Sequence, residues 1–126
     1  MTFNALDLGD AEEEKEITGQ LDELAPGDAM LVVTRGNNHG ATYLLDSDII
    51  RAGRNPDNEI FLDDVTVSRK HAEFHRLENH FELRDTGSLN GTYVNGNRID
   101  AITLNANDEV QIGAFKLLFL TGPSGR

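Results

Sequence analysis

Residues 53–96 read GRNPDNEIFLDDVTVSRKHAEFHRLENHFELRDTGSLNGTYVNG, and they hold three short clusters of polar residues and glycines. The clusters are Gly53-Arg54, Ser68-Arg69-Lys70-His71 and Asp85-Thr86-Gly87-Ser88-Leu89-Asn90-Gly91-Thr92. Each cluster lies between runs of strand-like composition, so each is expected on a connecting loop. Loops held by a rigid scaffold are where binding residues concentrate.

The clusters combine guanidinium groups, hydroxyls and a side-chain amide with glycines that let a ligand approach the backbone closely. This set suits a dianion with many acceptor oxygens, because arginine matches phosphate geometry with charge-assisted bonds and hydroxyls add donors. An asparagine amide can also hold a peptide backbone through both its donor and its acceptor. The sequence therefore predicts a phosphorylated peptide as the ligand.

At these residues the sequence resembles the forkhead-associated (FHA) domain family, whose members are β-sandwiches that bind phosphothreonine. The matching motifs are Gly53-Arg54, Ser68-Arg69-x-His71 and Ser88-x-Asn90-Gly91-Thr92, followed by Val94-Asn95-Gly96. The resemblance covers residues 29–122. It implies that Arg54 and Ser68 hold the phosphate, that Arg69 contacts the phosphate or neighbouring peptide residues, and that Asn90 clamps the peptide backbone.

Other residues of the motifs are expected to play supporting parts. Thr86 and Leu89 flank Asn90 and are expected to touch the peptide. The resemblance makes His71 a loop buttress that bonds to backbone. Gly53 and Gly91 are expected to support the same loops, and Gly91 is expected to supply backbone freedom, as are Gly87 and Gly96.

Two kinds of chemistry compete with this interpretation. Ser68, His71 and Asp85 would form a Ser/His/Asp set, but no nucleophile elbow or oxyanion hole surrounds the serine. His71 and His75 lie in a strand-like run with no third and fourth ligand evident, so we expect no metal site. The acidic segments Asp57-Asn58-Glu59 and Asp63-Asp64 lack the glycine and final glutamate of a calcium loop, and a solvated rim accounts for them better.

Composition narrows the class of protein further. The chain has 126 residues, enough for one domain and a tail, and no cysteine, which excludes a disulfide framework and a thiolate zinc site. Residues 1–28 carry nine Asp or Glu and one Lys, giving −8, while residues 29–126 carry thirteen acids and ten bases, giving −3. An acidic chain disfavours nucleic acid as a partner. Without a membrane-length apolar run or a secretory signal, cytoplasm is the expected location.

From residue 29 onward the pattern is β throughout, with about ten short strands at spacings of roughly 8 to 12 residues. We therefore expect an all-β, FHA-type antiparallel sandwich of about 10 or 11 strands over residues 29–122. Residues 123–126 are expected to be a short C-terminal tail. In the strand over residues 71–77, Ala72, Phe74 and Leu77 are expected to face the core.

Residues 1–28 are predicted to be a mostly disordered, acidic regulatory tail. Within it, Ile17, Leu21 and Leu24 share one face of a helical turn, although Gly19 weakens the pattern. A solvated spacer and a short recognition segment are both open interpretations of this part of the tail.

Within the FHA family the chain resembles a subgroup of small proteins, the glycogen accumulation regulators and oxoglutarate dehydrogenase inhibitors. The shared runs are residues 64–69, residues 87–95 and the ending at residues 120–123. In this subgroup a Ser/Thr kinase phosphorylates a threonine in a Glu-Thr-Thr-Ser tail motif, and the phosphothreonine binds the FHA surface of its own chain. Here the corresponding stretch is Glu16-Ile17-Thr18-Gly19, so Thr18 is the expected phosphorylation site.

The resemblance implies a non-catalytic phosphothreonine-binding regulator that acts as a monomer without a cofactor. Its implied partners are phosphothreonine-containing proteins, a Ser/Thr protein kinase, 2-oxoglutarate dehydrogenase, glutamate-metabolising enzymes and its own phosphorylated tail. The alternative is a scaffold that recruits phosphorylated partners and has no self-switch.

Overall fold

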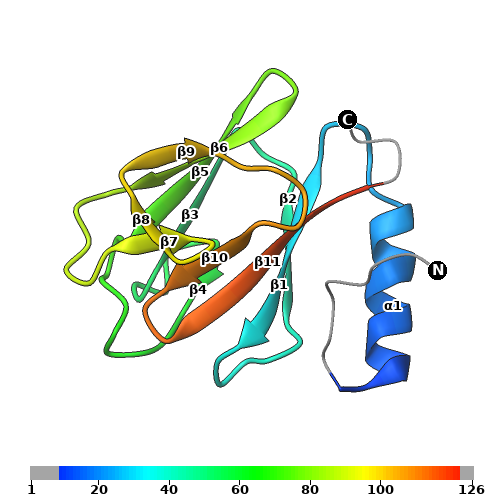
Figure 1. Cartoon of the computed structure of the whole chain (residues 1–126), viewed down its shortest axis with the longest axis horizontal. Helices are drawn as coiled ribbons and strands as arrows, with labels where there is room; N and C mark the ends of the chain where they lie inside the picture. The colour runs from blue at the N-terminus through cyan, green and yellow to red at the C-terminus, as the bar shows by residue number, and fades with distance from the viewer. Residues whose placement is uncertain (1–8, 123–126) are drawn as a thin grey trace.

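Two β-sheets packed face to face and one helix make up the computed structural model, which describes residues 9–122 (Figure 1). The strands in chain order are β1 (Ala29–Arg35), β2 (Thr42–Leu45), β3 (Ile49–Gly53), β4 (Ile60–Phe61), β5 (Ala72–Leu77), β6 (His80–Asp85), β7 (Thr92–Val94), β8 (Asn97–Ile99), β9 (Ala101–Thr103), β10 (Glu109–Ile112) and β11 (Phe115–Thr121). One sheet has the order β2-β1-β11-β10-β7-β8, and the other has the order β4-β3-β5-β6-β9. The predicted all-β sandwich is confirmed, with one parallel pair, β3 and β4, among antiparallel neighbours.

The core lies between the two sheets and follows from the two-residue period of the strands. Phe74 of β5 is paired with Ile50 of β3 on one side and with Leu83 of β6 on the other, and all three are buried. From the facing sheet, Leu31 and Leu117 join the same cluster. This packing holds the ends of β3, β5 and β6 in fixed positions, and the three predicted loops start or finish at these ends.

The expectation that Leu77 faces the core is wrong. Since Ala72 and Phe74 point inward, the next inward position of β5 is residue 76, and Leu77 is 37% exposed. Arg76 takes that position with its guanidinium 5.6 Å from the centre of the Phe81 ring. Its charge is paired with Asp28 at 3.0 Å, which fastens the segment before β1 to the second sheet.

A helix, α1 (Ala11–Asp22), precedes the sandwich where we expected a mostly flexible tail. The Asp10 carboxylate caps it by accepting bonds from the backbone N–H groups of Glu12 (3.0 Å) and Glu13 (3.2 Å). Acidic residues in the first turn also complement the positive end of the helix dipole. The expected tails at residues 1–8 and 123–126 lie outside the described residues. No helix of the described chain is long and apolar enough to cross a membrane.

Helix α1 packs on the outer face of the first sheet (Figure 1). Ile17 is 3% exposed and lies among Met30 and Val32 of β1 and Leu118 and Leu120 of β11. Both faces of β1 are therefore covered, which explains why its first five residues are all buried rather than alternating.

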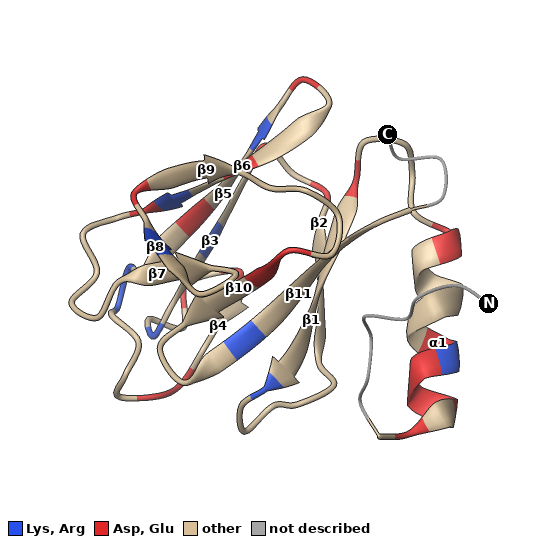
Figure 2. Cartoon of the chain, in the orientation of Figure 1, with Lys and Arg blue, Asp and Glu red and all other residues tan. Residues whose placement is uncertain are grey.

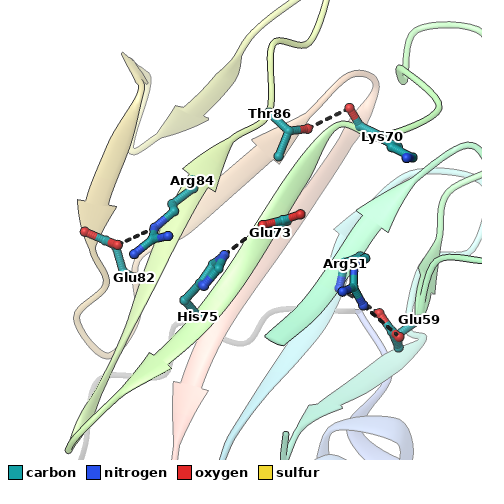
Figure 3. A network of polar contacts seen from close by, with 8 residues as sticks. All are labelled: Arg51, Glu59, Lys70, Glu73, His75, Glu82, Arg84 and Thr86. Carbon is teal, nitrogen blue, oxygen red and sulfur yellow. Dashed lines mark hydrogen bonds and ion pairs between the residues drawn. The ribbon is translucent and has the colours of Figure 1, made fainter. Parts of the chain in front are cut away.

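The outer face of the second sheet is polar instead. Arg51, Glu73 and Arg84 lie side by side across β3, β5 and β6, so charges of opposite sign alternate. Figure 3 shows this face, with the Glu73 carboxylate 2.8 Å from His75 Nε2. The two sheets thus differ: one outer face is covered by a helix, and the other is solvated.

Candidate functional site

The three clusters singled out in the sequence meet at one end of the sandwich. The Arg54 backbone N–H, just after β3, donates to the Ser68 carbonyl at 3.0 Å. The Thr86 N–H, just after β6, donates to the His71 carbonyl at 3.1 Å. The Leu89 N–H donates to the Ser68 hydroxyl oxygen at 2.9 Å, which closes the ring of loops.

Arg54 is oriented by its own neighbourhood. Its side chain is half-buried, and Nε donates to the Val67 carbonyl at 3.0 Å, which leaves the two terminal nitrogens of the fork for an outside acceptor. Arg69 is exposed, and the two arginines line a shallow depression of about 290 Å³ together with Asn55 and Pro56. The depression therefore presents two cations to one incoming anion.

Ser68 and Asn90 each keep bonding capacity for a ligand. The Ser68 hydroxyl accepts a bond from the Leu89 N–H, so its proton can be donated to an outside oxygen. Asn90 is exposed, and one N–H of its amide donates to the Thr66 carbonyl at 2.9 Å. That bond fixes the amide while its carbonyl oxygen and second N–H can pair with a peptide backbone. A second depression of about 430 Å³ begins at Thr66 and Asn90 and continues along Tyr93.

His71 is a buried buttress between two loops. Its Nδ1 accepts from the Ser68 backbone N–H at 3.1 Å, and its Nε2 lies 2.8 Å from the Gly91 carbonyl, which requires a proton on Nε2. Burial lowers the pKa of His71, against the opposing effects of the Gly91 bond and the Asp85 charge. Both ring nitrogens are occupied by backbone groups, so the ring does not activate the Ser68 hydroxyl as a catalytic base would.

Asp85 organises the loop that carries Asn90, a role that the sequence analysis missed. Its carboxylate accepts from the Gly87 N–H (2.9 Å), the Ser88 N–H (3.1 Å), the Ser88 hydroxyl (2.5 Å) and the Thr92 hydroxyl (2.7 Å). Partial burial acts to raise the pKa of Asp85, but the bonds from Ser88, Thr92 and Gly87 together hold the pKa below its ordinary value. The signal was the Asp-Thr-Gly-Ser sequence, which is typical of an Asp side chain that bonds to its own turn.

Asn58 is an exception to the solvated rim that we expected at residues 57–59 and 63–64. Its side chain is buried, and its amide nitrogen donates to the Asn55 carbonyl at 2.9 Å and to the Arg69 carbonyl at 2.8 Å. A Cβ on Gly53 would meet that amide nitrogen at 2.7 Å and the Arg69 carbonyl oxygen as well. The Asn58 side chain therefore holds the Arg69 loop next to the end of β3, and the absence of a side chain at Gly53 leaves room for the Asn58 amide.

Asp64, in the same acidic stretch, shapes the loop before β5. Its carboxylate accepts from the backbone N–H (2.8 Å) and the hydroxyl (2.6 Å) of Thr66, and these bonds lower the pKa of Asp64. The Thr66 hydroxyl in turn accepts from the Ala114 N–H at 2.8 Å. Val65, between Asp64 and Thr66 in the sequence, is 91% exposed at the tip of this loop.

The remaining predicted site residues are placed differently. Leu89 is 85% exposed beside Asn90. The Thr86 hydroxyl donates to the Lys70 carbonyl at 2.7 Å, so it ties two loops together (Figure 3). Gly91 has a φ of +89°, so its backbone conformation favours glycine, and a Cβ there would also displace the Arg98 side chain, whose Nε would lie 2.8 Å away.

Thr18 is not brought to this site. It lies in α1 on the outer face of the first sheet, exposed, and its hydroxyl donates to the Glu14 carbonyl at 2.9 Å. Within residues 9–122, no group of three or more His, Cys, Asp or Glu side chains is arranged to hold a metal ion.

Comparison with known proteins agrees with this geometry. A model of the FHA domain matches residues 50–113. The chain is 57% identical over 110 residues to the glycogen accumulation regulator GarA of Mycobacterium tuberculosis, covering 87% of this chain and 67% of the relative. It is 56% identical over 103 residues to the oxoglutarate dehydrogenase inhibitor of Corynebacterium efficiens, covering 82% and 72%. A solved FHA domain, from work on phosphothreonine-dependent FHA domain interactions, superimposes with a TM-score of 0.70 at 28% identity, over 76% of this chain and 98% of that one.

Proposed function

Because this chain belongs to the FHA domain family, we propose that it is a regulatory protein that binds phosphothreonine peptides through Arg54, Ser68, Arg69 and Asn90. The observation that carries the proposal is the arrangement of unused donors at one end of the sandwich. The Arg54 fork and the Ser68 hydroxyl are fixed by bonds to Val67 and Leu89, yet each keeps a donor for a phosphate oxygen.

These donors account for discrimination between phosphorylated and unmodified peptides. A charge-assisted hydrogen bond contributes about 1.5 to 3 kcal/mol, so two or three of them correspond to roughly a hundredfold or more in affinity. Asn90 would contribute equally to both forms, because it addresses the peptide backbone. The proposed binder is therefore switched by the state of one threonine.

The proposal extends to regulation and to a target. Relatives that are more than 50% identical are named oxoglutarate dehydrogenase inhibitors, so we place 2-oxoglutarate dehydrogenase and glutamate-metabolising enzymes among the targets. A Ser/Thr kinase would phosphorylate Thr18, and the phosphothreonine would occupy the site of its own chain. In this proposal the protein is a cytoplasmic monomer and carries out no catalysis itself.

A calorimetric titration tests the binding site. The full chain with Thr18→Ala, which cannot be modified at that position, is titrated with a peptide of residues 12–24 carrying phosphate on Thr18. We expect micromolar binding that disappears without the phosphate and weakens at least about tenfold in Arg54→Ala. Arg51→Ala removes the same charge three residues earlier, from β3, where Arg51 is paired with Glu59, and should leave the affinity unchanged. Equal affinity for both peptide forms would contradict the proposal.

An activity measurement tests the target. Purified 2-oxoglutarate dehydrogenase is assayed with the unmodified protein and with protein carrying phosphothreonine at residue 18. We expect inhibition by the unmodified protein and its loss on phosphorylation. If binding to phosphopeptides is found but neither form changes the dehydrogenase, the scaffold interpretation is correct instead.

A further inference from the structure

The segment that carries Thr18 is already docked elsewhere on the molecule. We propose that residues 11–24 have two mutually exclusive positions: α1 on the outer face of the first sheet, and Thr18 in the phosphothreonine site. In the first position the helix opposes self-binding, and in the second the apolar sheet face is uncovered. This inference rests on the proposed function and adds a competing docking surface to it.

The docked position is held by specific packing. Ile17 is buried among Met30, Val32, Leu118 and Leu120, and Leu21 and Leu24 pack against the same cluster. A polar contact joins the Thr42 hydroxyl to the Gln20 side-chain carbonyl at 3.4 Å. These contacts must break before Thr18 can leave the sheet, so helix docking competes directly with self-binding.

Phosphorylation would weaken the docked helix. The phosphate would add about two negative charges at Thr18, with Glu14 four residues before it and Asp22 four residues after it on the same side of the helix. Figure 2 shows how acidic this helix is already, and its last turn holds no basic residue. Lys15 is the one cation in the helix. Modification also removes the hydroxyl proton that bonds to the Glu14 carbonyl.

Distance along the chain decides when Thr18 can reach the site. Ala29 is paired with Thr121, at the end of the sandwich away from the site, whereas Ala114, just before the other end of β11, donates its N–H to the Thr66 hydroxyl beside the site. The eight residue steps from Ala114 to Gly122 span about 26 Å of strand. The eleven steps from Thr18 to Ala29 reach at most about 38 Å when extended. Thr18 can therefore span the sandwich once the segment has left the sheet.

A disulfide at the end of the segment should remove that reach. A Cβ on Gly122 would lie 3.2 Å from the Leu24 Cβ, close to the spacing in disulfides, and the sequence has no cysteine of its own. In the double variant Leu24→Cys, Gly122→Cys, only six steps separate Thr18 from the anchor, about 21 Å when extended. This is shorter than the strand that Thr18 must pass.

The experiment uses the full-length double variant, with and without phosphothreonine at residue 18, oxidised or reduced. The probe is a synthetic peptide of residues 12–24 with phosphothreonine at position 18, and its apparent Kd is measured by fluorescence polarisation. In the reduced phosphorylated protein, self-binding competes with the probe and should raise its apparent Kd about a hundredfold. When the phosphorylated protein is oxidised, its Kd for the probe should return to that of the unphosphorylated protein. The Kd of the unphosphorylated protein should be the same in the oxidised and reduced states.

Three other outcomes are informative. A site that stays masked in the oxidised phosphorylated protein would overturn the inference, because release of the segment would not be needed. Unchanged probe affinity in the reduced phosphorylated protein would also overturn the inference, because phosphorylated Thr18 would then not occupy the phosphothreonine site. If the unphosphorylated protein fails to bind the probe in either redox state, the proposed function fails and the inference with it.

Two variants test the competition without a cross-link. Ile17→Ala removes packing from the docked helix, so the phosphorylated tail should occupy its own site more often. The apparent Kd of the probe for the phosphorylated protein should rise about tenfold. Gly19→Ala is the matched variant with the opposite expected effect, stabilisation of the docked helix, since a Cβ there meets nothing within 4 Å and alanine favours the helix. In the phosphorylated protein it should lower the apparent Kd of the probe about two- to fivefold. Equal masking in the two variants would count against the competition.

Discussion

The Ser68 backbone N–H donates to Nδ1 of the buried His71 ring, and the opposite ring nitrogen, Nε2, bonds to the Gly91 carbonyl. One neutral imidazole thus joins the loop that carries Ser68 to the loop that carries Asn90. A second proton on Nδ1 would point at the Ser68 N–H, so the site is built on the neutral form of His71.

Stability should therefore depend on pH between neutrality and mild acid. Burial lowers the pKa of His71 below its ordinary value of 6.5. The unfolded chain takes up a proton as the pH falls through 6.5, while the native ring stays neutral, so the free energy of unfolding decreases on acidification until the lowered native pKa is passed. Urea unfolding at several pH values between 7.5 and 5 measures this.

Two variants separate His71 from the other titrating groups. His71→Gln should be less stable at pH 7.5, by about 1 to 3 kcal/mol, yet show a shallower loss of stability toward acid. His80→Gln removes an exposed histidine and should keep the slope of the unmodified protein. The same slope in all three proteins would mean that His71 is not the responsible group.

Asp85 should stabilise the Asn90 loop through its four accepted bonds. Asp85→Asn replaces an oxygen with a donor and leaves some of the Gly87, Ser88 and Thr92 donors unpaired, so we expect a loss of about 1 to 3 kcal/mol at pH 7. The pKa of Asp85 is held low, so its contribution is present above the unfolded value of 3.8 and is lost as the pH falls through the native pKa. The difference between the two proteins should be constant from pH 7 to 5 and shrink below about 4. Asp46→Asn, at an exposed position, should change little.

The strands and the site loops could be predicted because their signals are local. Gly53-Arg54 and Ser88-Leu89-Asn90 interrupt runs of alternating residues, and such interruptions are typical of loops. The positions of Asn58 and Arg76 could not be predicted in this way. What buries Asn58 is the Arg69 carbonyl of another loop, and what draws Arg76 inward is the Phe81 ring and Asp28.

The docked helix was only partly visible in the sequence. Ile17, Leu21 and Leu24 mark one face of it, but Gly19 weakens the helical pattern, and the surface that covers Ile17 comes from β1 and β11. A clearer signal lay elsewhere, in the unbroken apolar runs of β1 and β11. An antiparallel strand with one solvated face alternates, so a continuous run indicates that something covers both faces.

Gly53→Ala should damage the site and the fold together. The added Cβ would meet the Arg69 carbonyl and the Asn58 amide nitrogen, which already bond to each other, so one of the two loops must move. Overpacking of this kind costs about 1 to 3 kcal/mol, and the displaced Arg69 loop should also weaken phosphopeptide binding. Thermal unfolding and calorimetry measure the two effects. Gly19→Ala, the same change in open space on α1, should raise the melting temperature instead.

Asn90→Ala should weaken peptide binding without weakening the fold. Asn90 is exposed, and its one bond within the described residues, to the Thr66 carbonyl, lies at the surface where water can replace it. The amide groups that would clamp a peptide are lost, so we expect about a tenfold weaker Kd for the phosphothreonine peptide of residues 12–24, with a melting temperature within about a degree or two of the unmodified protein. Asn97→Ala, at the exposed first position of β8, is the matched control and should leave the Kd unchanged. If both variants bind equally well, the peptide does not use the Asn90 amide, and the phosphate contacts of Arg54 and Ser68 carry the affinity alone.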